Sequence, residues 1–148
     1  MRTHTIFNVD GSQEIIPFSA EEEAEWDARD GAIAASGEEV DAERERRIAM
    51  PLTVALAGGT KVFRINMDEK SQRNIQGLAT VGINMALGGI TTTVAFRDYD
   101  NVMQDLTAED LRNMGLQAAA RIQTVYAKSW ALKAMTPIPG DYTDDVYW

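Results

Sequence analysis

The sequence predicts a small α+β domain, because short hairpin patterns alternate with helical patterns along its 148 residues. Several segments have β-branched or alternating residues on both sides of a turn, and most are followed by a helix start signal. A chain of this size corresponds to one domain, which can bury roughly two thirds of its unfolded surface. We therefore expect an N-terminal hairpin, an acidic helical arm and a small domain of two hairpins and two helices.

Residues 1–50 are predicted to form the N-terminal hairpin and the acidic helical arm. Residues 5–9 alternate like a short strand, and the Asp10–Gly11 pair favours a two-residue turn into a return strand over residues 13–16. Ser19 followed by Glu22 is a capping box, so a helix is expected to begin at Ala20.

The acidic helix has a weak middle. Gly31 and Gly37 each cost about 1 kcal/mol relative to alanine in a helix interior, so the sequence is compatible with one helix or with two. Trp26, Ile33 and Val40 recur every seven residues and would form a thin apolar seam on a charged helix. Because such a helix cannot bury that seam alone, we predict these three residues as part of a protein interface.

Residues 51–136 are predicted to form the compact α+β domain. Residues 52–56 and 61–65 read as two strands joined at Gly58 and Gly59. A helix is expected to follow, with an apolar face between Ile75 and Ala86, and to stop at Gly88.

A third hairpin and the longest helix come next. Residues 91–96 and 102–106 are predicted strands on either side of an Asp- and Asn-rich turn. Thr107 is the predicted N-cap of a helix that begins at Ala108, with Asp110 completing the cap. Its core face is predicted to contain Leu111, Ala118, Val125 and Leu132, flanked by Met114, Ile122 and Trp130.

Residues 137–148 are predicted to form an acidic aromatic tail, because Pro137 and Pro139 break the helix before them. Aromatic side chains are enriched at interfaces. We therefore predict that the tail docks on a neighbouring surface, with Tyr142, Tyr147 and Trp148 as interface residues.

Composition excludes several classes of protein. The formal net charge is −9, and eleven of the 23 acidic residues lie between Glu21 and Glu45. Binding to nucleic acid requires clustered lysine and arginine, so we expect no nucleic-acid partner. No run approaches the roughly 20 apolar residues of a membrane span, and there is no cysteine. We expect a soluble intracellular protein.

No residue pattern predicts catalysis, a cofactor or a metal. The only histidine is His4, and the carboxylates at 98, 100 and 105 lack the glycine and glutamate of an EF-hand loop. They are better interpreted as turn residues. A small metabolic enzyme would require a cleft with strongly shifted titratable groups, which no pattern here predicts. We therefore expect a non-enzymatic protein.

Five short segments and the end of the chain carry a family resemblance. The segments are ERERRI (43–48), QRNIQGLA (72–79), VAFRDYDNV (94–102), LTAEDL (106–111) and SWALK (129–133), and the end is PGDYTDDVYW (139–148). In this order they resemble an uncharacterised tail-protein domain family of tailed bacteriophages. The acidic helix also resembles the front end of tail fibre assembly proteins.

The resemblance implies one of two roles. The first is a structural protein made in the host cytoplasm and built into the virion tail, in contact with other tail proteins of the fibre or baseplate. The second is a tail fibre assembly chaperone that is not retained in the particle. We expect the first, because an apolar seam and an aromatic tail are surfaces that a permanent neighbour would cover. A homo-oligomer, possibly a trimer, would let the seams of different copies meet.

Overall fold

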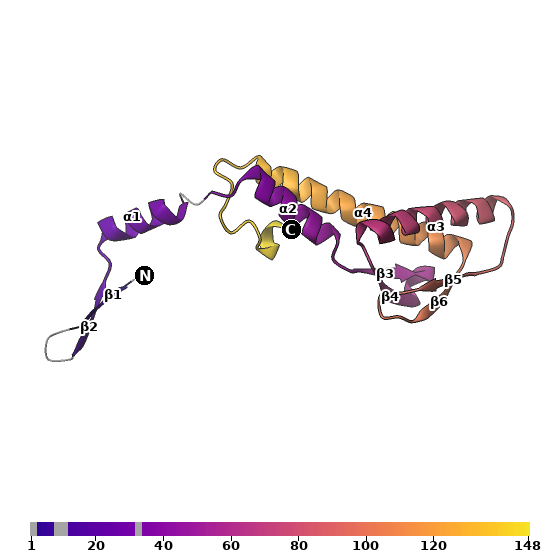
Figure 1. Ribbon diagram of the computed structural model, residues 1–148, viewed down its shortest axis with the longest axis horizontal. Coiled ribbons are helices and arrows are strands. Elements are labelled where there is room, and N and C mark those ends of the chain that lie inside the picture. Colours follow the sequence, from indigo (N-terminus) through magenta and orange to yellow (C-terminus); the bar gives the residue numbers. More distant parts are fainter. Residues whose placement is uncertain (1–2, 8–11, 32–33) are drawn as a thin grey trace.

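The computed structural model describes residues 3–7, 12–31 and 34–148, and it confirms the predicted α+β class. The chain forms a projecting N-terminal part and a body in which two hairpins lie on one face of a pair of long helices (Figure 1). The elements in chain order are β1 (Thr3–Phe7), β2 (Gln13–Pro17), α1 (Ala20–Gly31), α2 (Gly37–Ile48), β3 (Leu52–Leu56), β4 (Lys61–Ile65), α3 (Glu69–Leu87), β5 (Val94–Arg97), β6 (Met103–Leu106) and α4 (Ala108–Lys133).

The hairpin of β3 and β4 supplies the strand side of the main core. Its antiparallel register pairs Val54 with Phe63 and Leu52 with Ile65. Side chains alternate between the two faces of a strand, so Val54, Leu56, Phe63 and Ile65 point to the same side, while Val62 points to the other. That side packs against α3 and α4 in a core of Val54, Leu56, Phe63, Ile65, Met67, Ile75, Met85, Leu106, Leu111, Met114 and Ala118.

The hairpin of β5 and β6 lies beside the first one. The Tyr99 amide donates to the Arg64 carbonyl at 2.8 Å, and the Phe96 ring lies 6.2 Å from the Phe63 ring. The turn between the strands is organised by Asp98, whose carboxylate accepts hydrogen bonds from the Val102 amide at 2.9 Å and from Gln104 at 2.8 Å. The structure thus confirms Asp98 as a turn residue.

Helices α3 and α4 run antiparallel and approach each other closely at two glycines. A Cβ atom at Gly82 would lie 2.6 Å from the Ala108 carbonyl oxygen, and one at Gly115 would lie 2.6 Å from the Ala79 Cβ. Real Cβ atoms do not tolerate such distances, so only glycine permits this separation of the two helices. Because α4 is longer than α3, its second half extends beyond the main core (Figure 1).

Helix α2 packs on that second half of α4. Its start is capped by Ser36, whose hydroxyl accepts from the Glu39 amide while Glu39 accepts from the Ser36 amide at 2.7 Å. The acidic segment therefore forms two helices, one of the two alternatives that the sequence left open. The contacts assign α2 to the body, although the predicted boundary at residue 50 places it in the arm. With the C-terminal residues, α2 and α4 form a second apolar cluster of Val40, Ile48, Val125, Leu132 and Trp148.

The start of α4 is as predicted, but one predicted core residue is not buried. Thr107 is the N-cap, and its side chain accepts from the Asp110 amide at 3.2 Å. Trp130, expected on the core face, is 59% exposed. The reason is helical geometry: its neighbour Ser129 is fully buried, and each residue turns the helix by about 100°, so Trp130 points away from the buried face. The Trp130 ring contacts Tyr126 at the helix surface, with 5.8 Å between centroids.

Candidate protein-interaction surfaces

The N-terminal arm, defined as β1, β2 and α1, projects away from the body (Figure 1). Before Gly37, no side chain whose burial the structure describes is buried. Ile15 is 67% exposed and Ile16 is 37% exposed, although both lie in β2. The arm joins the body where the Ala35 amide donates to the Ile138 carbonyl at 3.2 Å. It therefore presents apolar surface that its own body does not cover.

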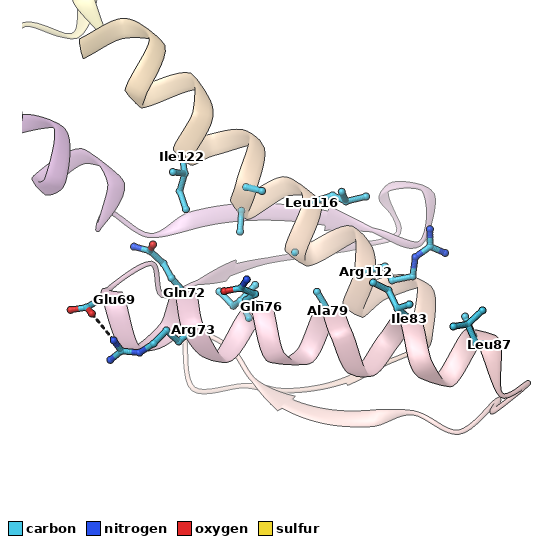
Figure 2. Close-up of a pocket in the computed structure, with 15 residues that line it drawn as sticks. Glu69, Gln72, Arg73, Gln76, Ala79, Ile83, Leu87, Arg112, Leu116 and Ile122 are labelled. Carbon is cyan, nitrogen blue, oxygen red and sulfur yellow. Dashed lines mark hydrogen bonds and ion pairs between the residues drawn. The ribbon is translucent and has the colours of Figure 1, made fainter. Parts of the chain in front are cut away.

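A second candidate surface is the α3–α4 groove, which lies between the two long helices and has a volume of about 740 Å³ (Figure 2). Its middle is lined by small residues, namely Ala79, Gly115 and Ala119. Larger aliphatic residues at its rim are Ile83, Leu87 and Leu116, of which Leu87 is 83% exposed and Leu116 is 63% exposed. A contiguous apolar surface of this kind is typical of a binding site for another protein.

The charged residues that line the described groove lie near its two ends. Glu69 and Arg73 lie at the start of α3 and pair with each other at 2.5 Å (Figure 2). Arg112 lies at the other end, near Leu87. Within the described part of the chain, the Arg112 side chain has no hydrogen-bond or ion-pair partner.

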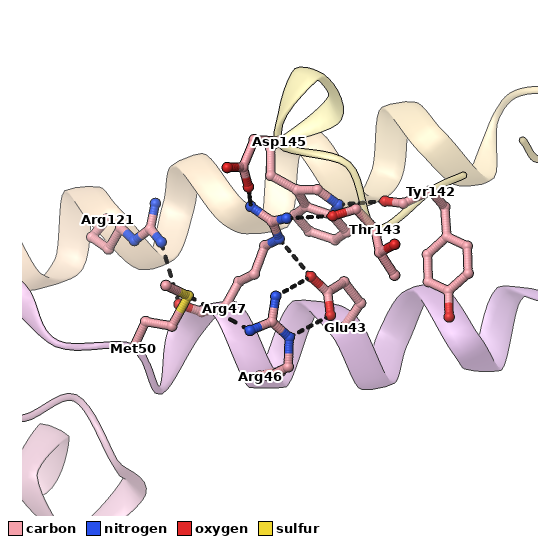
Figure 3. Close-up of polar contacts among 9 residues, drawn as sticks. Glu43, Arg46, Arg47, Met50, Arg121, Tyr142, Thr143 and Asp145 are labelled. Carbon is pink, nitrogen blue, oxygen red and sulfur yellow. Dashed lines mark hydrogen bonds and ion pairs between the residues drawn. The ribbon is translucent and has the colours of Figure 1, made fainter. Parts of the chain in front are cut away.

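The C-terminal tail docks on its own chain, with Arg47 at the centre of the contact (Figure 3). The Arg47 guanidinium donates to the Glu43 carboxylate and to the Thr143 carbonyl, both at 2.6 Å, and pairs with Asp145 at 2.8 Å. The indole N–H of Trp148 donates to the Tyr142 carbonyl at 2.6 Å.

Burial and charge make this contact a fixed part of the structure. The side chains of Glu43 and Arg47 are both buried, and a buried ion pair requires such additional hydrogen bonds to offset the loss of hydration. Hydrogen bonds from the Arg46 and Arg47 guanidinium groups outweigh desolvation and lower the pKa of Glu43 below its usual value, with Arg46 the larger cause. Glu43 therefore stays ionised at neutral pH.

The predicted interface residues are thus found in different places. Val40 and Trp148 are buried inside their own chain, so they cannot contact a second protein without rearrangement. Tyr142 and Tyr147 are half-buried against the same cluster, with the Tyr147 hydroxyl 3.1 Å from Asp141. Ile33 and the Trp26 side chain lie outside the described residues.

The seven-residue spacing does not follow one continuous helix, because α1 ends at Gly31 and α2 begins at Gly37. The predicted neighbouring surface for the tail is, in this structure, the surface of α2 and α4. The seam and the tail were both predicted to contact another protein, because the sequence does not show that α2 packs against α4.

The comparison with protein families gives one match. The model of DUF4376, described as a domain of unknown function, matches residues 27–146. The chain belongs to this family. The DUF4376 match begins within α1 and ends in the C-terminal tail, so it includes the whole body and the α3–α4 groove. No curated protein and no solved structure matches the chain.

In the part of the chain that the structure describes, no helix is long and apolar enough to cross a membrane. No group of three or more histidine, cysteine, aspartate or glutamate side chains is placed to hold a metal ion there.

The α3–α4 groove was not predicted from the sequence. Its signal was present, because Gln72, Gln76, Ala79, Ile83 and Ala86 recur at alternating spacings of three and four residues, the pattern of a helix face that meets another helix. The predicted apolar face between Ile75 and Ala86 includes Ala79 and Ala86, which line the groove, together with Ile75 and Met85, which belong to the main core. One predicted face therefore corresponds to two surfaces in the structure.

Proposed function

We propose that this protein is a non-enzymatic structural component of a bacteriophage tail, built into the virion in the fibre or baseplate region and acting through contacts with other tail proteins. The tail assignment rests on the sequence resemblance described above. The structural observation that supports action through protein contacts is the exposed N-terminal arm.

The arm supports this proposal because a two-stranded hairpin is only marginally stable in water unless it packs on something else. Among the described residues, neither its hairpin nor α1 packs extensively on the body. The first turn of α1 also has three glutamates, Glu21, Glu22 and Glu23, which favours a partner with basic residues. A neighbouring tail protein would cover Ile15 and Ile16 and hold the arm in one position.

The first experiment is quantitative mass spectrometry of purified, salt-washed particles of the phage that carries the gene. We expect a fixed copy number per particle, comparable to that of fibre or baseplate proteins. Absence from washed particles, combined with abundance in the infected cell, would favour the second candidate, a fibre assembly chaperone. The acidic helix, which such chaperones share by resemblance, is the feature that supports this alternative.

A second experiment tests the arm itself. Ile15→Glu places a charge at a 67% exposed strand position, and Val62→Glu does the same at a 61% exposed position of β4 in the body. We expect Ile15→Glu to reduce incorporation into particles and Val62→Glu to leave it unchanged. Equal incorporation of both variants would exclude Ile15 from the contact.

A further inference from the structure

We propose that the α3–α4 groove is a self-association surface, in which a second copy of this chain packs its own groove antiparallel against the first to form a four-helix interface. The inference concerns the groove alone and does not depend on the tail assignment. Three properties of the groove favour a second copy as its occupant.

The first property is the charge pattern along the groove. Glu69 lies at the beginning of α3 and Arg112 at the opposite end, beside the end of α3 (Figure 2). A two-fold axis through the middle of the groove would bring Glu69 of each copy to Arg112 of the other. In an isologous interface every such pair occurs twice, so the charges of both ends are satisfied.

The partners within one chain permit these pairs. Arg73 binds only the Oε1 atom of Glu69, which leaves Oε2 to accept from a second guanidinium. Arg112 has no ion-pair partner among the described residues, so its five N–H donors remain available. An antiparallel copy would therefore add two ion pairs without breaking the Glu69 pair with Arg73.

The second property is the shape of the groove. Leu116 projects from the α4 side near the middle of the groove, close to the level of Ala79 on α3 (Figure 2). Gly115 lies directly against Ala79, and Ala119 also lines the groove. A two-fold axis near this level would place Leu116 of one copy against the small residues of the other. Interlocking of a large side chain with small ones is the usual packing of paired helices.

The ends of the groove match in the same way. Ile122 lies at the Glu69 end, and Ile83 and Leu87 lie toward the Arg112 end. In the antiparallel arrangement these aliphatic side chains would contact each other across the interface. The most exposed apolar residues of α3 would then be removed from water.

The third property is size. From Glu69 to Leu87 the groove is about 27 Å long at 1.5 Å per residue. Two helix faces each about 10 Å wide would bury on the order of 500 Å² per copy, which gives about 1,000 Å² in total and reaches the lower limit of specific interfaces. We therefore expect a weak, reversible dimer.

The first test is sedimentation equilibrium of the full chain between about 1 and 300 μM. We expect a monomer–dimer equilibrium, with the Kd raised at least tenfold by Leu116→Glu. Val81→Glu is the matched control, because Val81 is an exposed residue of α3 that does not line the groove. A monomer at all concentrations would overturn the proposal, as would a dimer that Leu116→Glu leaves unchanged.

Charge reversal tests the antiparallel arrangement. Glu69→Arg and Arg112→Glu, each alone, would place like charges together and raise the Kd. The double variant Glu69→Arg/Arg112→Glu would restore the pairs in exchanged form and return the Kd to within about threefold of the original value. If the Kd of the double variant stays raised although circular dichroism shows that the variant is folded, the antiparallel groove-to-groove arrangement is rejected.

Discussion

The guanidinium carbon of Arg47 lies 5.2 Å from the centroid of the Trp148 ring, so α2 holds the last residue of the chain by a cation–π contact. The same guanidinium reaches Glu43, Thr143 and Asp145, which makes it the main polar link between α2 and the tail. Lysine cannot replace this arrangement, because a single ammonium group does not reproduce a planar fork of donors.

We therefore predict that Arg47→Ala destabilises the folded chain by roughly 3 to 5 kcal/mol, the usual cost of breaking a buried ion pair. The tail is expected to detach first, which would expose Trp148, 8% exposed in the structure, and shift its fluorescence to longer wavelength. Urea unfolding and limited proteolysis of residues 139–148 measure both effects.

Arg46→Ala is the matched control for this prediction. Arg46 also binds Glu43, but its own side chain is 58% exposed. Exposed ion pairs contribute about 0 to 1 kcal/mol, so the loss of stability is expected to be much smaller. If both variants release the tail equally, Arg47 has no special role in holding it.

The glycine contacts between α3 and α4 predict opposite effects of the same substitution at two positions of α3. Gly82→Ala is expected to destabilise the chain by about 1 to 3 kcal/mol, because its Cβ would collide with the Ala108 carbonyl and force the helices apart. Gly77→Ala has no atom within 4 Å of the new Cβ and is expected to stabilise α3 by about 0.5 to 1 kcal/mol. Thermal unfolding compares the two directly, and a stabilised Gly82→Ala variant would contradict the observed helix separation.

Loss of the N-cap of α4 is expected to lower the stability of the chain less than loss of Arg47 does. Thr107→Ala removes the hydroxyl that accepts from the Asp110 amide and is expected to cost about 1 kcal/mol. Thr124→Ala is the control in the same helix, because Thr124 lies in the interior, where its hydroxyl bonds the Ala120 carbonyl. Alanine there is expected to be neutral or slightly stabilising. A loss of stability at both positions would indicate that the cap is not the cause.

The parts of the fold that could be predicted from the sequence are those decided by neighbouring residues. Strand alternation gave β3 and β4 with their observed bounds, and the pattern of Thr107 with Asp110 gave the start of α4. These signals depend on side chains only a few positions apart, so no knowledge of the tertiary structure was required.

The remaining features depend on residues far apart in the chain. Periodicity assigns an apolar face to α4 but does not say that α2 covers its second half, which is why Trp130 was expected to be buried and Val40 was expected at an external interface. The tail was predicted to dock on another protein, whereas in the structure it packs on α2 and α4 of its own chain. Arg47 makes much of that contact, and nothing in the sequence distinguishes it from other charged residues. The groove was missed because its alanine and glycine residues give a weak hydrophobic signal.

Asp110 predicts how stability depends on pH. Burial tends to raise the pKa of its carboxyl group, but the hydrogen bonds from Lys61 at 2.8 Å and from Thr107 outweigh burial, so the pKa is lower in the folded chain than in the unfolded one. A lowered folded-state pKa gives stability that is present above the unfolded pKa of about 3.9 and is lost as the pH falls through the folded value.

Asp110→Asn is therefore expected to reduce stability at neutral pH, with the difference from the original chain shrinking below about pH 4. Urea unfolding at several pH values measures this, with Glu109→Gln as an exposed control in the same helical turn. A difference that stays constant from neutral to acidic pH would show that Asp110 does not contribute through its charge.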